Sequence, residues 1–203
     1  MRKLVLLEFL TLDGVMQAPG GPDEDRSDGF SFGGWQMEFG HDDAQQARRA
    51  ADIDATGAWL FGRRTYDNFA SFWPLFEPAD NKWAAAFNSR PKYVVSRTLK
   101  EPLSWNGTTL VNDDVVATVR SLKEEPGGQI TVIGSGNLAQ TLLDNDLVDE
   151  IGLSVYPLIL GTGKRLFGEG LDARRFELFE TLPSEQGAVM LYYRRSGEPV
   201  SRS

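Results

Sequence analysis

Short apolar runs alternate with amphipathic segments along most of the chain. Residues 3–12 are nearly all apolar, which is typical of a strand buried on both faces in the middle of a parallel or mixed sheet. Further apolar runs predict strands at 58–61, 93–95, 109–111, 130–133 and 150–160. Helical spacing predicts helices at 42–54, 64–70, 81–88, 114–124 and 137–143, with Asp42 or Asp43 at the start of the first and Asp113 as the cap of the fourth.

The C-terminal part shows a different period. Residues 175–181 and 188–194 alternate in period two around 184–187, which indicates an antiparallel hairpin. The whole pattern predicts an α/β fold, a three-layer α/β/α sandwich with a mixed, mostly parallel central sheet and this hairpin at its end. We expect one domain over 1–195, a flexible tail at 196–203 and a mobile loop at 18–34, which is rich in Gly, Asp and Pro.

Composition excludes several classes of partner. The formal net charge is −8, so a nucleic-acid backbone would be repelled. The longest apolar runs span only several residues, and the first residues lead straight into a strand rather than a signal peptide. We therefore expect a cytoplasmic protein that binds neither nucleic acid nor membrane.

Residue counts also limit the chemistry. The chain has no Cys and one His, which excludes thiol nucleophiles, disulfides and Cys-based zinc sites, and we expect no metal. A Ser-His-Asp hydrolase would have to use His41, but no Gly-x-Ser-x-Gly motif occurs. A surface or capping role of His41 is favoured.

In open α/β sheets, ligands bind beyond the carboxyl ends of the parallel strands. That rule selects four segments: 13–14, 62–65, 96–98 and 134–137. At the second, Gly62 permits close backbone approach, Thr65 is expected to cap the next helix, and Arg63 or Arg64 offers a charge-assisted contact to a phosphate. A surface turn with solvated arginines is the alternative for this segment.

The third and fourth segments strengthen the phosphate interpretation. Residues 96–98 place two hydroxyls around the guanidinium of Arg97, which suits a 2′-phosphate and favours NADPH over NADH. Residues 134–139 match Gly-x-Gly-x-x-Gly/Ala between a strand and a helix. The segment lies two-thirds along the chain, and Asp149 and Glu150 precede the next strand, so a Rossmann fold is not indicated.

Four ordered motifs carry a family resemblance. Segments 60–66 (LFGRRTY), 92–98 (KYVVSRT) and 132–138 (VIGSGNL) resemble the three NADPH-contacting segments of dihydrofolate reductase, and 12–16 (LDGVM) resembles the end of its first strand. With 156–167 (YPLILGTGKRLF), the chain is most similar to the reductase domain of the bifunctional riboflavin-biosynthesis deaminase-reductase. The resemblance covers about residues 2–194.

The resemblance implies a cofactor and the residues that hold it. Segment 62–65 would hold the pyrophosphate, 96–98 the 2′-phosphate side, and 133–138 the diphosphate and nicotinamide ribose, while Phe9 and Met16 would flank the nicotinamide. The implied NADPH set is Phe9, Met16, Gly62, Arg63, Arg64, Thr65, Ser96, Arg97, Thr98, Ile133, Gly134, Ser135, Gly136, Asn137 and Leu138. The resemblance also implies a cis peptide between Gly134 and Ser135.

The implied activity is NADPH-dependent reduction of a small heterocycle, with 5-amino-6-(5-phosphoribosylamino)uracil as substrate. The zinc ligands of the deaminase domain are absent, so we expect reduction alone. Dihydrofolate reductase has a carboxylate on its first long helix, but here that helix follows an insert at 19–39 and no acid aligns, which disfavours folate. The alternatives are a pteridine or dihydrofolate reductase and a non-catalytic NADP-binding module.

Hydride transfer to a polar bond also needs a proton donor. The candidates are Asp13, Asp25, Trp35 and Tyr66, although Asp13 before Gly14 is also typical of a turn. Residues 161–165 (GTGKR) suit either a sugar phosphate or a turn or subunit contact. The aromatic stretch 69–83 suits core or a dimer surface, so a homodimer is an open alternative.

Overall fold

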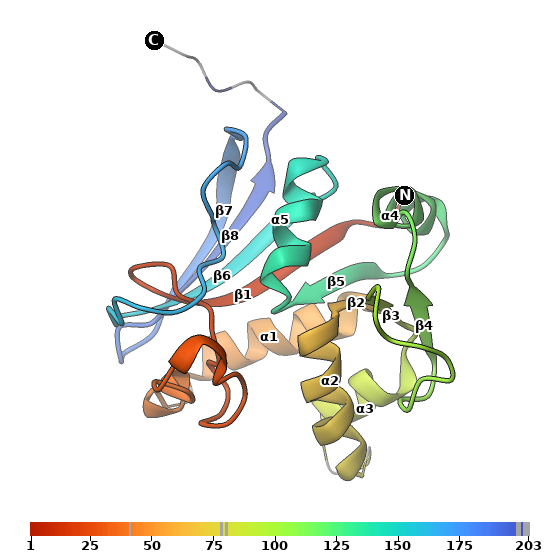
Figure 1. Ribbon diagram of the computed structural model, residues 1–203. Coiled ribbons are helices and arrows are strands. Elements are labelled where there is room, and N and C mark those ends of the chain that lie inside the picture. Colours follow the sequence, from red (N-terminus) through yellow and green to blue (C-terminus); the bar gives the residue numbers. More distant parts are fainter. Residues whose placement is uncertain (41, 78, 80, 198–199, 201–203) are drawn as a thin grey trace.

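A mixed eight-stranded sheet forms the centre of the computed structural model, which describes residues 1–40, 42–77, 79, 81–197 and 200 (Figure 1). The strand order is β4-β3-β2-β5-β1-β6-β8-β7. The strands are β1 (Leu4–Thr11), β2 (Thr56–Gly62), β3 (Lys92–Val95), β4 (Thr108–Val111), β5 (Gln129–Ile133), β6 (Glu150–Tyr156), β7 (Phe176–Pro183) and β8 (Val189–Arg195).

The helices of the described residues are α1 (Asp43–Ala55), α2 (Arg63–Phe72), α3 (Lys82–Ser89), α4 (Val115–Glu124) and α5 (Gly136–Asp144). Three short 3-10 helices, η1 to η3, span Ser27–Gly29, Trp35–Glu38 and Trp73–Leu75. No helix in the described part of the chain is long and apolar enough to cross a membrane.

The sheet has the mixed topology that the sequence predicts. Strands β1 to β6 pair in parallel, while β8 runs antiparallel to β6 and β7 antiparallel to β8. Strand β1 is central, as its apolar run predicts. It stays paired with β6 through Thr11, but its pairing with β5 ends at Leu7 and Ile133. From Glu8 onward, β1 is therefore paired with β6 but not with β5.

Helices cover both faces of this sheet (Figure 1). On one face, α4 and α5 pack against alternate β1 residues in a cluster that includes Leu4, Leu6 and Leu10. On the other face, α1, α2 and α3 pack on β2 through Trp59 and Phe61. The two apolar faces of the sheet are both buried, which confirms the three-layer α/β sandwich.

Side-chain caps fix where the helices begin. Asp42 is the N-cap of α1 and accepts from the N–H of Gln45 at 2.9 Å. Asp114, not Asp113 as predicted, caps α4 through the N–H of Ala117 at 2.9 Å. Adjacent aspartates are equal candidates by sequence, and in the structure the second one occupies the N-cap position.

The strand predicted at 150–160 ends earlier, at Tyr156. Pro157 follows and has no N–H to donate to a neighbouring strand. The N–H groups of Leu160 and Gly161 instead donate to the Asp13 carboxylate at 3.2 and 2.9 Å. The chain therefore leaves the sheet and packs against the turn after β1.

The segment 18–34, expected as a mobile loop, packs onto the molecule as part of the insert at 18–39. Phe30 and Trp35 are buried in a cluster with Tyr156. The Gln17 amide donates to the carbonyls of Asp25 and Ser27, each at 3.1 Å. Polar composition indicates a loop, but it does not show whether the few aromatic residues of that loop are buried against the rest of the protein. His41 and most of the tail predicted at 196–203 lie outside the described residues.

Candidate active site

Three strand-end segments meet at one edge of the sheet. The Ser135 hydroxyl accepts from the N–H of Gly62 at 2.9 Å, and the N–H of Ser135 donates to Thr65 Oγ1 at 3.0 Å. Arg63 Nη1 donates to Thr98 Oγ1 at 2.6 Å. The loops that follow β2, β3 and β5 are thus hydrogen-bonded to one another, as their common sheet edge predicts.

The loop after β5 depends on its glycines. Gly134 has a φ of +60°, and a Cβ there would lie 2.9 Å from Thr65 Oγ1. A Cβ on Gly136 would lie 2.8 Å from the sulfur of Met16. The peptide after Gly134 is not cis, contrary to the implied geometry; among the described residues the cis bond is Glu101–Pro102. Gly134 and Ser135, both with positive φ, make the turn instead.

The starts of α2 and α5 lie beside these loops. Their N-cap residues, Gly62 and Ser135, make no side-chain capping bond. Thr65 does not cap α2 as predicted, because its hydroxyl accepts from Ser135. First-turn N–H groups without a capping side chain favour an anion at both helix starts.

The loop after β3 forms a hydroxyl-stabilised turn with an exposed cation. Ser96 Oγ accepts from the N–H groups of Thr98 and Leu99 at 3.2 and 3.1 Å. The Arg97 side chain is exposed. Beside it, a shallow hollow of about 380 Å³ is lined by Leu99, Lys100, Glu101, Leu110 and Asn112.

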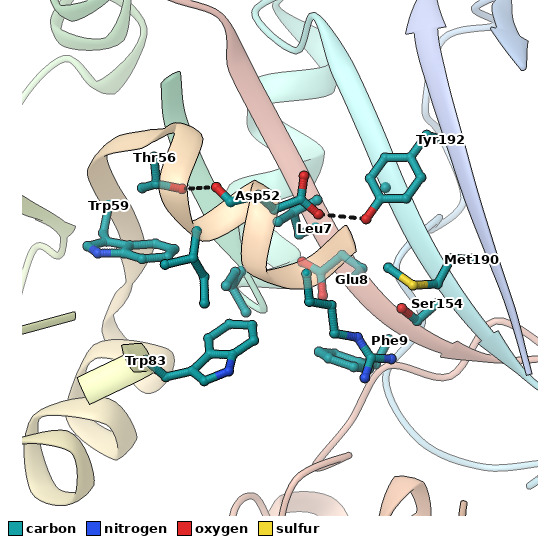
Figure 2. Close-up of a pocket in the computed structure, with 14 residues that line it drawn as sticks. Leu7, Glu8, Phe9, Asp52, Thr56, Trp59, Trp83, Ser154, Met190 and Tyr192 are labelled. Carbon is teal, nitrogen blue, oxygen red and sulfur yellow. Dashed lines mark hydrogen bonds between the residues drawn. The ribbon is translucent and has the colours of Figure 1, made fainter. Parts of the chain in front are cut away.

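A second, mostly apolar cavity of about 50 Å³ lies between α1 and the sheet (Figure 2). Ile133 at the end of β5 borders it, which places it next to the loop that begins at Gly134. Its lining is Leu7, Glu8, Phe9, Arg49, Asp52, Ile53, Thr56, Trp59, Trp83, Ile133, Gly152, Ser154, Met190 and Tyr192.

Glu8 is one of the residues of this site that the sequence analysis missed. Glu8 is only 4% exposed, although it carries a carboxyl group and lies in the middle of β1. The N–H of Gly134 donates to the carboxyl, while Oε1 has no partner. Burial raises the pKa of Glu8 well above its usual value, and the Gly134 N–H offsets only part of that effect. The sequence feature that could have identified Glu8 is a single acid within a nearly all-apolar strand.

Two charged residues of α1 also line the cavity. Asp52 accepts from the Tyr192 hydroxyl at 2.6 Å and pairs with Arg48, while burial raises the pKa of Asp52. Arg49 donates to the Tyr156 hydroxyl at 3.1 Å, and its Nε has no partner. The first long helix thus does present a carboxylate to the cavity, at a position that sequence alignment did not identify.

Two proton-donor candidates have structural contacts elsewhere. Asp13 accepts from the Thr11 hydroxyl at 2.6 Å and from two backbone N–H groups, and these bonds lower its pKa to about 2. Tyr66 is buried against Trp105, and its hydroxyl accepts from the Trp105 N–H at 3.3 Å. Neither lines the cavity between α1 and the sheet.

The other two candidates hold the insert. Trp35 donates from Nε1 to the Gln17 carbonyl at 2.8 Å and packs edge-on to Tyr156. Burial opposes the ionisation of Asp25, but hydrogen bonds from Lys164 and Ser27 outweigh it and lower the pKa of Asp25 to about 2. Lys164, from the basic segment 161–165, is therefore paired with the insert.

Known proteins share both the sequence pattern and the fold. The family model for the RibD C-terminal domain matches residues 2–190. The uncharacterized protein YyaP of Bacillus subtilis (strain 168) is 33% identical over 141 residues, which are 68% of this chain and 73% of that protein.

Two solved structures share the architecture. A protein assigned to riboflavin biosynthesis from Shewanella sp. PV-4 aligns with a TM-score of 0.73 at 22% identity, over 96% of this chain and 99% of that one. Dihydrofolate reductase from Enterococcus faecalis, complexed with NADP(H), aligns with a TM-score of 0.58 at 14% identity, over 96% of each chain. Both support the dihydrofolate reductase-like fold.

Proposed function

Because the chain belongs to the RibD C-terminal domain family, we propose that it is an NADPH-dependent reductase of a small heterocycle. The substrate type that we propose is 5-amino-6-(5-phosphoribosylamino)uracil. One observation carries the proposal: three hydrogen-bonded loops suited to a dinucleotide stand directly beside a cavity that contains buried ionisable groups.

The residues present fit NADPH. The starts of α2 and α5 would hold the pyrophosphate, and the tight backbone at Gly134 and Gly136 leaves no room for larger residues beside it. Exposed Arg97 would bind the 2′-phosphate above the hollow after β3 and β4. NADPH supplies a hydride when bound, and the chain orients it toward the cavity.

The cavity supports a small, polar ring as substrate. Arg49 and Asp52 offer donors and an acceptor of the kinds that pair with ring carbonyl and amino groups. Its volume of about 50 Å³ has room for one or two waters. A pyrimidine therefore requires the half-buried side chain of Trp83 to turn outward.

The test combines binding and turnover. Titration with NADPH should quench the fluorescence of the five tryptophans in a saturable way at micromolar cofactor. NADPH oxidation should then follow addition of 5-amino-6-(5-phosphoribosylamino)uracil and not of dihydrofolate. Binding without turnover of either compound would favour a non-catalytic NADP-binding module, and the absence of binding would exclude both functions.

We also propose a cytoplasmic homodimer. Phe72, Leu75 and Phe76 are 50%, 78% and 38% exposed beside the aromatic cluster of α2 and α3. Exposed apolar patches of this kind mark association surfaces. Sedimentation at increasing concentration should show a species of twice the chain mass, and Leu75→Glu should shift it to the monomer.

A further inference from the structure

Glu8 lies where the proposed cofactor loop and the proposed substrate cavity meet. Pairing of β1 with β5 ends at Leu7, so Glu8 is the first residue of β1 beyond that pairing. One carboxyl oxygen of Glu8 accepts from Gly134, in the cofactor loop, and the residue also lines the cavity under α1. Figure 2 shows Glu8 among the residues that line the cavity, together with Asp52 and Ser154.

We propose that Glu8 is the acid that protonates the substrate during hydride transfer, because its unpartnered Oε1 is buried at the junction of cofactor loop and cavity. This inference rests on the proposed reductase function. A buried polar atom without a partner is costly, and such atoms in folded proteins call for a functional reason.

The surroundings favour a neutral carboxyl at Glu8. From the insert, the charge of Glu24 opposes ionisation of Glu8. From α1, Asp52 is engaged by Arg48 and by Tyr192 of β8, and Arg49 donates to Tyr156. Within the described residues, Glu8 has no ion pair with a cation. Desolvation therefore favours the protonated form of Glu8.

The step balances with NADPH as the reductant. The carbon of a C=N or C=O bond in the substrate gains the hydride, and the electron pair of the double bond moves to the nitrogen or oxygen. That atom takes the proton from Glu8 Oε1, which leaves a carboxylate. NADP⁺ and the reduced substrate are the products, and Glu8 regains a proton from water after they leave.

The first experiment follows the Glu8 carboxyl without any substrate. Protein labelled with ¹³C at the glutamate carboxyl carbons is titrated by NMR, and the signal absent from Glu8→Gln identifies Glu8. A midpoint well above the ordinary range of glutamate is expected, with and without NADPH. A midpoint in the ordinary range of glutamate would overturn the proposal, because the proton would already be lost at working pH.

The second experiment measures turnover of the uracil substrate. Glu8→Gln is isosteric and should lower kcat/KM by about 100-fold or more, the range of general-acid catalysis, while the NADPH dissociation constant changes less than about twofold. Wild-type kcat/KM should fall as pH rises through the Glu8 pKa, and the variant's low rate should be flat. Glu177→Gln, exposed on β7, is the matched control.

The outcomes separate the two proposals. Failure of the wild type to bind NADPH or to reduce the substrate overturns the proposed function. Wild-type turnover with an unchanged rate and pH profile in Glu8→Gln overturns the role of Glu8 alone. Weakened NADPH binding with unchanged kcat in Glu8→Gln also overturns it, since Glu8 would then hold the cofactor rather than supply a proton.

Discussion

At the scale of single residues, two buried ionisable side chains have contrasting surroundings. Glu8 keeps one oxygen unpartnered, whereas Lys92 Nζ donates to the carbonyls of Phe87, Asn88 and Arg90 at 3.0, 3.3 and 2.9 Å. Lys92 thereby satisfies the carbonyls at the end of α3, where the helix dipole favours a cation. The satisfied group is structural, and the unsatisfied one is our candidate for chemistry.

Lys92→Met should destabilise the protein by about 1–3 kcal/mol, because buried carbonyls lose their donor. Burial lowers the pKa of Lys92 from 10.5 to about 8. Between these values the unfolded chain binds more protons, so this group's contribution to stability rises with pH. The free energy of unfolding, measured in urea from pH 7 to 10.5, should rise more steeply in the wild type than in Lys92→Met. Parallel curves would contradict this account, and Lys100→Met serves as an exposed control.

Arg97→Ala should weaken NADPH binding by about ten- to hundredfold, because a lost charge-assisted hydrogen bond costs about 1.5–3 kcal/mol of binding free energy. NADH lacks the 2′-phosphate, so its affinity should be unchanged. Fluorescence titration with both cofactors measures the ratio, with Arg194→Ala on β8 as control. Equal losses for the two cofactors would remove the case for NADPH selectivity.

At the scale of elements, β2 and β5 approach unusually closely at their starts. A Cβ on Gly57 would lie 2.7 Å from the backbone nitrogen of Gly128, and the register of this pair shifts between Thr56 and Ala58. The neighbour is backbone and cannot turn aside as a side chain can. Glycine at this position therefore keeps the two strands in register, and with them the loops that follow Gly62 and Ile133.

Gly57→Ala should destabilise the protein by about 1–3 kcal/mol through overpacking. Gly21→Ala is the matched control, since a Cβ there meets nothing within 4 Å, and it should change stability by less than about 0.5 kcal/mol. Thermal and urea unfolding of the two variants measure the difference. Equal stability would mean that β2 and β5 separate without cost.

At the scale of the whole molecule, the insert joins parts that are distant in sequence. Asp25 pairs with Lys164 from the segment after β6, and with Arg64 at the start of α2 at 3.5 Å. Glu24, from the same insert, acts electrostatically on Glu8. Docking of the insert therefore links the cofactor loops, the cavity and the segment 157–167.

Asp25→Asn should loosen the insert, because the amide cannot replace the carboxylate toward Lys164 and Arg64. The pKa of Asp25 is lowered to about 2, so its contribution in the wild type is present above pH 3.8 and is lost as pH falls toward 2. Limited proteolysis at pH 7 should cleave within 18–39 several-fold faster in the variant. Asp23→Asn, in an exposed pair with Arg26, should cleave at the wild-type rate. If both variants matched the wild type, the ion pairs would not hold the insert.

The sequence by itself determined the central buried strand, the terminal hairpin and the loops that meet at the sheet edge, because side-chain period and strand-end position are local properties. Only the tertiary structure decided that Thr65 binds Ser135 rather than capping α2, that Asp52 reaches Tyr192 across 140 positions, and that the Glu8 carboxyl accepts from Gly134 after β5. A buried polar atom forms its hydrogen bond with a group that lies within about 3 Å. The order of residues along the chain does not specify which groups come that close, because the folded sheet brings them together.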